Sequence, residues 1–474
     1  MKRKGIILFI LGLILSLFSP SLIGAKANSA QHSFFGTYAS GIISTDETSP
    51  VVVTKEDLVF YIDSFPTLYD TENLSSYDSR VSATYTFHNP AAYNVTSRLV
   101  FPLGTQPDYI DNEDYLNAVA GYDIKVDDVV VDKTIRYTYS NTNQFNIEED
   151  LPRLRDTVQD HDFFNDELAV FRYEVRVTAP SVQSGTDIAV EINVPSDFTG
   201  IIISNKHRGH QTTFSGAKIR YWIDNADSFF VYTLGQPFDT FADNITVFDS
   251  FYQGDEIDAT ATIVNKVAID FDSLINRYRD DIPYVNDVDY KNAMIDWLDE
   301  RFATNRTRFD NEYVFNIQHH LLTWYDYEMT VNAGESVTNQ VIAPLFPHVR
   351  TDYDPSVYNY DYLLTPASTW ADFSNLTIEI VTPYYLTTTN ILGFSKTATG
   401  YILTLDELPE EDLTFQLSTG ENPVRRNTGL EIVISILAGI GAVIGLAVLS
   451  VYAMGGLVLI IYFSIRASKK NQRR

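Results

Sequence analysis

Alternation of apolar and polar side chains is the dominant pattern along the chain. It is clearest over residues 169–178, where Phe171, Tyr173 and Val175 alternate with Arg172, Glu174 and Arg176. Successive side chains of a strand point to opposite faces of a sheet, so a period of two predicts a half-buried strand. The pattern recurs at residues 81–87, 135–139, 188–194 and 325–331. We therefore predict a mainly β chain with two or more antiparallel β-sandwich-like domains.

One segment, residues 271–311, departs from this pattern. Asp287 or Asp289 is placed to cap a helix, and the apolar residues that follow recur at spacings of three and four: Ala293, Met294, Trp297, Leu298 and Phe302. Such a stripe indicates an amphipathic helix. We predict a helical insert whose Trp297 packs in a core or between domains.

The first 27 residues have the pattern of a cleaved signal peptide. Lys2, Arg3 and Lys4 precede an uncharged stretch over residues 6–18, and Ala25 and Ala27 supply small residues before the expected cleavage point. An uncleaved anchor is the alternative. It is disfavoured because the apolar stretch would span about 20 Å as a helix, whereas the hydrocarbon core of a bilayer is ~30 Å thick.

Residues 432–465 contain no charged side chain and predict one C-terminal transmembrane helix. The tail, residues 466–474, carries five Lys and Arg, which favour a cytoplasmic location. The expected topology is a single-pass protein of the cell membrane, with the N-terminal body extracellular and the C-terminus cytoplasmic. Within the span, Gly441 and Gly445 have the spacing that lets two helices approach closely. They predict contact with a helix partner in the membrane, and plain lipid exposure is the alternative.

The pattern divides the chain into seven segments. These are a signal peptide (1–27), an N-terminal β domain (28–180), a second β region (181–270), a helical segment (271–311), a membrane-proximal β domain (312–424), the transmembrane helix (432–465) and the basic tail (466–474).

Composition narrows the class of protein. The formal net charge is −28, but the two ends hold nine of the 34 basic residues, so the body carries 25 basic against 62 acidic side chains and has a net charge near −37. That charge disfavours binding to nucleic acid. The chain has no cysteine, which excludes disulfides and thiol chemistry and favours a bacterial envelope over a eukaryotic extracellular setting.

Two resemblances point to bacterial surface proteins. Asn427-Thr428-Gly429, followed by an apolar span and a basic tail, resembles the end of a sortase signal of Gram-positive wall proteins, with Arg425 and Arg426 where that motif has Leu and Pro. The segment 81–131, with its Asn89-Pro90 turn and a strand ending in Phe101-Pro102-Leu103-Gly104, resembles VIT-type β domains. Both resemblances imply a surface location, and neither carries over site residues.

The sequence offers few candidates for chemistry. The usual metalloprotease, serine hydrolase and nucleotide-binding signatures are absent. The pairs His207/His210 and His319/His320 lack the arrangement of a zinc site. Asp108, Asp111 and Asp114 crowd one acidic loop and predict a calcium site, while a solvated loop is the alternative. A second acidic loop, residues 280–289, has the same two interpretations. No other cofactor is expected.

An aromatic run offers a further candidate. Tyr358, Tyr360 and Tyr362, with Tyr353 and Trp370 nearby, predict either a platform for sugar or peptide contact or an aromatic face buried inside a sheet. We favour the buried face.

The function these features favour is a non-enzymatic, single-pass envelope protein whose acidic ectodomain serves binding, adhesion or scaffolding. Its expected partners are the membrane, a cell-wall polymer or another envelope protein. The alternatives are an extracellular hydrolase that acts on wall polymer through paired carboxylates in a cleft, and an accessory subunit of a membrane complex.

Overall fold

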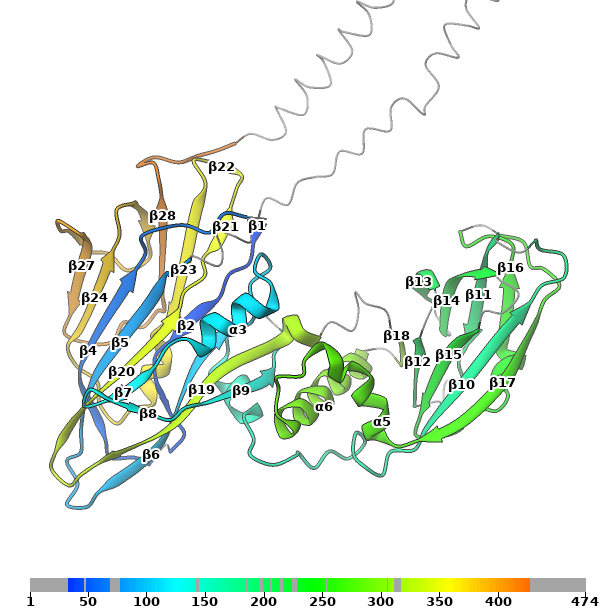
Figure 1. Cartoon of the computed structure of the whole chain (residues 1–474), viewed down its shortest axis with the longest axis horizontal. Helices are drawn as coiled ribbons and strands as arrows, with labels where there is room; N and C mark the ends of the chain where they lie inside the picture. The colour runs from blue at the N-terminus through cyan, green and yellow to red at the C-terminus, as the bar shows by residue number, and fades with distance from the viewer. Residues whose placement is uncertain are drawn as a thin grey trace, which may run out of the picture. The chain divides into compact units, whose positions relative to one another are not determined.

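The computed structural model describes residues 33–426, apart from gaps at 47, 69–76, 142–144, 184–185, 196–198, 205–206, 214–215, 224–227, 253, 305 and 311–316. The predicted signal peptide, transmembrane helix and basic tail lie outside the described residues. The described chain is mainly β and is built from several antiparallel sheets, which confirms that part of the predicted fold class (Figure 1). It separates into two compact units. The larger comprises residues 35–349 and 357–423.

The largest sheet of this unit has eight strands in the order β26-β27-β24-β4-β5-β20-β7-β8 (Figure 1). Its strands are β4 (Val52–Tyr61), β5 (Arg80–His88), β7 (Ile124–Val126), β8 (Val129–Val131), β20 (Ser336–Pro344), β24 (Leu376–Val381), β26 (Ser395–Lys396) and β27 (Gly400–Leu405). Alternation places Val81, Ala83, Tyr85 and Phe87 of β5 in the core, as their spacing predicts.

A second sheet covers the inner face of the first. It runs β21-β23-β28-β25, with β2 parallel to β23, and comprises β2 (Tyr38–Ser40), β21 (His348–Arg350), β23 (Val357–Leu363), β25 (Tyr385–Thr389) and β28 (Leu413–Ser418). Phe60 of β4 packs edge-on against Phe415 of β28, with ring centroids 5.0 Å apart, and against Tyr362 of β23 at 5.7 Å. Apolar side chains from both sheets therefore fill one sandwich core.

A third sheet, β3-β6-β19-β9, comprises β3 (Ile43–Ser44), β6 (Val95–Gly104), β9 (Thr134–Tyr139) and β19 (Leu321–Val331). β19 pairs antiparallel with β6, and β20 pairs antiparallel with β5. Strands from the predicted N-terminal and membrane-proximal β domains thus share sheets. Pairing crosses the boundaries drawn from the sequence because alternation identifies a strand without identifying its partner.

Residues 170–269 supply most of a second sandwich (Figure 1). One sheet, β17-β10-β15-β12-β18, contains β10 (Val170–Thr178), β12 (Gly200–Ser204), β15 (Phe229–Leu234), β17 (Thr260–Ile269) and β18 (Thr307–Asp310). The other, β13-β14-β11-β16, contains β11 (Thr186–Asn193), β13 (His207–Thr212), β14 (Gly216–Ile223) and β16 (Ile245–Phe248). Tyr173, Val190, Ile203 and Tyr221 belong to the core between them.

The predicted helical segment contains α5 (Phe271–Ile275), the 3₁₀ helix η4 (Asn276–Asp281) and α6 (Asp287–Thr304). Met294, Trp297 and Leu298 of α6 are buried, and they share a core with Tyr139 of β9 and Ile202 of β12. Trp297 therefore packs in a core, as its place on an apolar stripe predicts.

Short helices connect the strands elsewhere. They are α3 (Asn112–Ala120), α4 (Ile147–Asp150) and the 3₁₀ helices η2 (Leu151–Arg153), η3 (Phe241–Asn244), η5 (Ile317–His320) and η6 (Thr365–Thr369). Within residues 33–426, gaps excepted, no helix combines the length and the apolar character needed to cross a membrane.

The described part of the smaller unit contains both described ends of the chain. It includes β1 (Ser33–Phe34), residues 350–356 with β22 (Tyr353–Asp354), and β29 (Val424–Arg425). β29 pairs antiparallel with β22, and Arg425 donates from Nε to Asp352 Oδ2 at 2.9 Å. The two ends of the body therefore belong to one unit.

Candidate functional site

A shallow groove follows strand β25 and the turn that leads to β26 and β27. Its volume is about 430 Å³. It is lined by Leu386, Thr387, Thr388, Thr389, Leu392, Gly393, Phe394, Lys396 and Tyr401. β25 belongs to one sheet of the first sandwich, whereas β26 and β27 are the last two strands of the other, so the groove lies where the edges of two sheets meet.

Hydrogen bonds fix the floor of this groove. The pairing of β25 with β28 shifts register between Leu386 and Thr388, and the hydroxyls of Thr387 and Thr388 both donate to Gln416 Oε1, at 2.9 and 3.1 Å. Gln416 in turn donates to Asn359 Oδ1 at 2.8 Å. The threonine hydroxyls are thus held by the sandwich itself, which preforms the groove.

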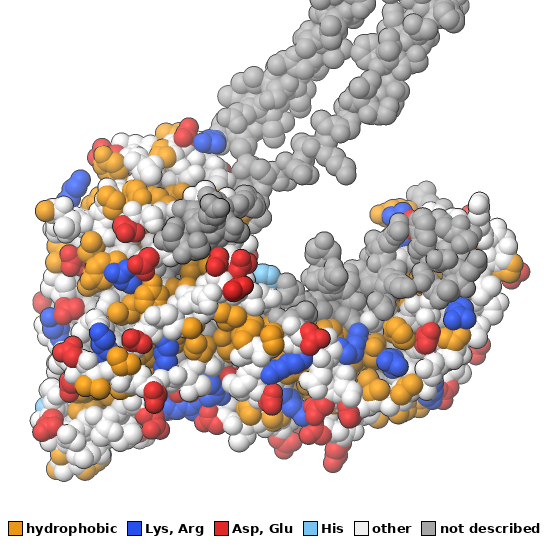
Figure 2. Space-filling view, in the orientation of Figure 1, with side chains coloured by type: hydrophobic (Ala, Val, Ile, Leu, Met, Phe, Trp, Pro, Cys, Tyr) orange, Lys and Arg blue, Asp and Glu red, His pale blue; other side chains and the backbone are white. Residues whose placement is uncertain are grey.

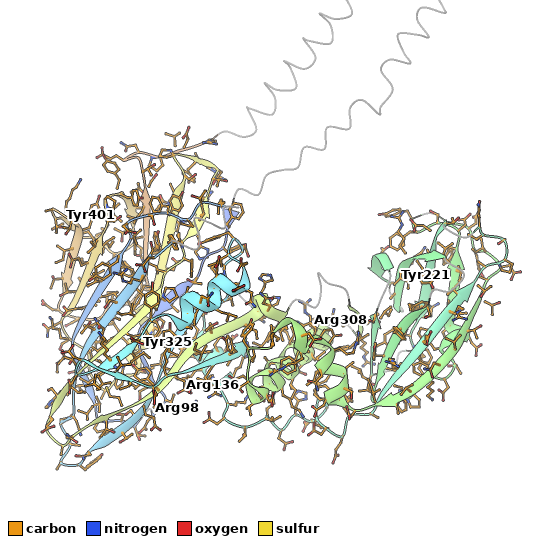
Figure 3. The ribbon with its side chains drawn as sticks, viewed as in Figure 1. Arg98, Arg136, Tyr221, Arg308, Tyr325 and Tyr401 are labelled. Carbon is orange, nitrogen blue, oxygen red and sulfur yellow. The ribbon has the colours of Figure 1, made fainter. Side chains whose placement is uncertain are left out.

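Tyr401 joins the two sheets across the groove. Its hydroxyl accepts from the backbone N–H of Leu386 at 3.0 Å and donates to the carbonyl of Tyr384 at 3.4 Å (Figure 3). Gly393 allows the turn opposite, because its φ of 108° is a conformation that L side chains rarely adopt. The groove therefore has a defined wall on each side.

The groove combines apolar side chains with three threonines and one cation, and exposed apolar side chains lie in it and next to it. The side chain of Leu392 is 81% exposed and that of Tyr385, at the start of β25, is 39% exposed. The Lys396 ammonium lies 5.6 Å from the centroid of the Tyr385 ring, within range of a cation–π contact. None of the nine lining residues is acidic, although the chain has 62 Asp and Glu. The groove therefore suits a neutral or anionic ligand with an apolar part.

A network of charged groups connects β6, β9 and β19 to α6. Arg136 of β9 donates from Nε to both carboxylate oxygens of Asp289, at 3.0 and 3.1 Å, and from Nη1 to Asp156 at 2.9 Å and Asp326 at 3.1 Å. Arg98 of β6 lies beside it and binds the same Asp156 and Asp326 (Figure 3). Hydrogen bonds from Arg136 and Arg98 lower the pKa of Asp156. Because these charges are mutually paired, the network holds α6 in place and leaves no free group for catalysis.

Glu56 is a carboxyl group inside the first sandwich. It is 0% exposed, and one of its oxygens accepts from the Tyr362 hydroxyl at 3.3 Å, while the other has no hydrogen-bond partner. The Tyr85 hydroxyl lies 3.1 Å from that of Tyr362. Burial raises the pKa of Glu56 to about 7 against the opposing effect of these tyrosine hydrogen bonds. The group is sealed from solvent, so it responds to pH without meeting a substrate.

The residues predicted to bind calcium have structural partners. Asp111 caps α3 by accepting from the backbone N–H of Asp114 at 2.9 Å, and Asp108 accepts from the N–H of Phe35 at 3.2 Å. Among the described residues, no group of three or more His, Asp or Glu is placed to hold a metal ion. The calcium site stays a prediction.

The second acidic loop supplies ion pairs at the start of α6. Asp287 pairs with Arg279 at 3.1 Å, and Asp289 is bound by Arg136. These partners fix the first turn of the helix.

The other candidates from the sequence are placed as follows. His319 and His320 belong to η5, and His207 and His210 to β13. Gly441 and Gly445 lie outside the described residues, so their role stays a prediction.

The aromatic run is mostly interior. Tyr360, Tyr362 and Trp370 are buried, as favoured from the sequence. Tyr358 lies stacked with Phe65, their ring centroids 3.7 Å apart.

Sequence reasoning missed the groove and Glu56. The groove depends on contacts from Gln416 and Asn359, which are distant along the chain, and the run Thr387–Thr389 with Gly393 was the available signal. Glu56 lies in the charged stretch Lys55-Glu56-Asp57, which has the pattern of an exposed segment. A register shift between Val53 and Lys55 moves Glu56 to the buried face of β4.

No family model and no curated protein matches the chain. Among solved structures, the chain is similar to the crystal structure of a protein from Legionella pneumophila subsp. pneumophila str. Philadelphia 1, described as a "putative nutrient binding protein". The match covers 82% of this chain and 72% of that chain, with 10% sequence identity and a TM-score of 0.31. A likeness this distant carries no argument about function.

Proposed function

We propose that the chain is a single-pass bacterial cell-envelope protein whose β-rich body lies outside the cell and binds a component of the envelope. The signal-peptide pattern of residues 1–27 and the uncharged stretch 432–465 with its basic tail support this topology. Binding is proposed to take place in the groove of β25, β26 and β27.

The observation that carries the binding proposal is the composition of the groove. Leu392 lines the groove and Tyr385 lies next to it on β25, near Lys396; both present apolar surface to water, and the Gln416 hydrogen bonds fix the floor of the groove. A preformed concave site that combines apolar side chains with a few polar groups is typical of ligand sites in proteins. The body as a whole is acidic and repels anionic chains. Because no carboxylate lines the groove, the groove is the place where we propose that an anionic chain binds.

The partner we propose is a cell-wall polymer. Tyrosine rings offer flat surfaces to sugar rings, and Lys396 offers a charge to an anionic substituent. A protein of the envelope is the alternative occupant, and the binding experiment below distinguishes the two.

Two arginines among the last described residues bear on the proposed orientation in the membrane. Arg425 and Arg426 precede the uncharged stretch by a few residues, on the side proposed to be extracellular. Both are paired with carboxylates of the smaller unit, Arg425 with Asp352 at 2.9 Å and Arg426 with Asp354 at 3.6 Å. On the extracellular side these two charges oppose the proposed orientation weakly, whereas the signal-peptide pattern and the five Lys and Arg after the span favour it.

The experiment is co-sedimentation of the purified full-length chain, held in detergent, with purified wall fragments. We expect saturable binding that falls at least tenfold in Leu392→Asp, because the substitution puts an acid in the groove. Val129→Asp is the matched control, since Val129 is also exposed but lies on β8.

Equal loss of binding in the two variants contradicts the proposed site. If wall fragments do not bind but a membrane extract yields a protein retained by the parent and lost in Leu392→Asp, the ligand is a protein. If the fragments are degraded instead of bound, the hydrolase alternative replaces the binding proposal.

A further inference from the structure

The three threonines that line the groove have already used their hydroxyl protons. Thr387 and Thr388 donate to Oε1 of Gln416, at 2.9 and 3.1 Å, and Thr389 donates to the carbonyl of Ile391 at 3.1 Å. A carbonyl oxygen can only accept, so each of these bonds uses the single proton of its hydroxyl. Toward a ligand, the three threonine oxygens can therefore act only as acceptors.

Tyr401 adds no donor to the groove. Its hydroxyl donates to the carbonyl of Tyr384 at 3.4 Å and accepts from the N–H of Leu386 at 3.0 Å (Figure 3). Lys396 is different. Within the described part of the chain its ammonium has no hydrogen-bond or ion-pair partner, and it lies 5.6 Å from the centroid of the Tyr385 ring. The side chains that line the groove thus offer three acceptors and one cationic donor.

A complementary ligand has the reverse pattern. It carries hydrogen-bond donors where it meets the threonines and a negative charge where it meets Lys396. Leu392 and Phe394 line the same groove and add apolar contacts. An anionic polymer without donors, such as polyphosphate, matches Lys396 alone, and a neutral sugar leaves Lys396 unpaired. A sugar unit with a charged substituent matches both.

An extended peptide matches the groove less well than a sugar does. Each backbone N–H of a peptide comes with a carbonyl that can only accept. Such carbonyls would meet threonine oxygens that also only accept, with Lys396 as the one donor group in reach. A sugar hydroxyl rotates, and it donates or accepts as its neighbours require. The hydrogen-bonding pattern therefore favours a sugar.

The charge of Lys396 acts against an acidic background. Figure 2 shows Asp and Glu side chains spread over the face of the described body in view, and the chain has 62 of them against 34 Lys and Arg. This background repels anions, whereas none of the residues that line the groove is acidic. At ordinary salt a single charge acts over roughly 10 Å. Lys396 is therefore the group that decides whether a charged sugar is favoured in the groove.

We propose that the groove selects a sugar unit that carries a negative charge, and that Lys396 sets this preference. The oxygens of Thr387, Thr388 and Thr389 accept from the hydroxyls of the same unit. This inference rests on the proposed function, in which the groove binds a wall polymer. A carboxylate and a phosphate ester both supply the charge, because a lysine binds either one as a point charge.

The test is isothermal titration calorimetry of the full-length chain in detergent at constant ionic strength. The probes are a β-linked glucuronate oligomer, the glucose oligomer of equal length, the same glucose oligomer carrying phosphate esters, and polyphosphate. We expect the glucuronate oligomer to bind about fivefold more tightly than the glucose oligomer, as expected for one exposed ion pair. Polyphosphate should give no saturable binding. The tighter of the two charged oligomers identifies the source of the charge.

Variants then assign the preference to single residues. Lys396→Gln should remove it, so that the charged and neutral oligomers bind with similar Kd. Thr388→Val should weaken both oligomers by the same factor, and Thr388→Ser, which restores the hydroxyl, should recover most of that loss. Lys218→Gln is the matched control, because Lys218 of β14 also lies over an aromatic ring, 4.2 Å from the centroid of Phe248. It should keep the preference of the parent.

Four outcomes overturn the inference: equal binding of the charged and neutral oligomers by the parent, a preference that persists in Lys396→Gln, a preference lost equally in Lys218→Gln, or saturable binding of polyphosphate. A peptide of alternating Ala and Glu that binds more tightly than the glucuronate oligomer would replace the sugar with a peptide. Far-UV circular dichroism shows whether each variant is folded, and Thr388→Ser provides the comparison if Thr388→Val is not.

The failure of this inference differs from failure of the proposed function. If the charged and neutral oligomers bind equally and both are lost in Leu392→Asp, the preference is refuted and the groove stays the proposed site. If none of the probes binds, the inference is wrong, and the co-sedimentation with wall fragments decides separately whether the groove binds a polymer.

Discussion

Asp352 Oδ2 accepts from Arg425 Nε at 2.9 Å, so the last described strand of the body is held by an ion pair just before the uncharged stretch 432–465. Arg350 donates to the same carboxylate at 2.7 Å. Hydrogen bonds from Arg350 and Arg425 hold the pKa of Asp352 below its usual value. Asp352 is thus the centre of the contact that joins β29 to its unit.

Asp352→Asn should loosen this junction. Arg425 is largely exposed, and exposed ion pairs contribute about 1 kcal/mol or less, so the free energy of unfolding of the whole body should change little. Trypsin should cleave after Arg425 and Arg426 several-fold faster than in the parent. Asp354→Asn is the control, because its pair with Arg426 is longer and more exposed. Equal cleavage rates in the parent and Asp352→Asn would show that Asp352 does not hold the strand.

The contribution of Glu56 to the stability of the body should fall as the pH rises. The pKa of Glu56 is about 7 in the folded chain, whereas its ordinary value, which we take for the unfolded chain, is 4.5. Between these two pH values the folded chain therefore holds the proton more tightly than the unfolded chain. The contribution of Glu56 to stability is then greatest below about pH 4.5 and is lost as the pH rises through about 7. The shift corresponds to about 3 kcal/mol as an upper bound.

Urea unfolding at a series of pH values checks this. The difference in unfolding free energy between Glu56→Gln and the parent should change by up to about 3 kcal/mol across that window, with the variant relatively more stable at high pH. Glu379→Gln is the control, since Glu379 alternates with the buried Ile378 and Ile380 of β24 and so points to the opposite face. A pH-independent difference for Glu56→Gln refutes the assignment.

Within the Arg136 network, we expect substitution of Asp289 to lower the free energy of unfolding most. It is 2% exposed and accepts from Arg136, from the backbone N–H of Tyr137 and from Asn286. Asp289→Asn should lower the free energy of unfolding by about 3 kcal/mol, as expected when one partner of a buried ion pair is removed.

Asp156→Asn is the comparison for that variant. The side chain of Asp156 is 64% exposed, although it binds the same arginine, so its loss should cost about 1 kcal/mol or less. Chemical denaturation of Asp289→Asn and Asp156→Asn measures the loss of unfolding free energy in each. Equal costs would show that burial does not decide the strength of these pairs.

Local features of the fold were readable from the sequence. The alternation over residues 169–178 corresponds to β10, and the apolar stripe of residues 293–302 lies within α6. The acidic loop predicts Asp111 as a calcium ligand, and its position before residues 112–120 also fits the helix cap that the structure shows. Such features depend on neighbours within a few residues.

Long-range relationships were not readable. β5 pairs with β20 some 250 residues along the chain, and β4 pairs in parallel with β24, which alternation cannot specify. The groove was not predicted for the same reason, because its floor depends on hydrogen bonds from Thr387 and Thr388 to Gln416, which is distant along the chain. That limit also hid Glu56. The register shift between Val53 and Lys55 places Glu56 on the buried face of β4, whereas the charged residues beside it predict an exposed position.

The most direct test of the account is protease treatment of intact cells that produce the full-length chain. The account predicts that the body, residues 33–426, is digested before lysis, while a fragment that contains residues 432–474 stays with the membrane. Loss of the body is followed with an antibody against it, and a cytoplasmic protein serves as the control for cell integrity. Survival of the body until the cells are lysed would contradict an extracellular binding protein.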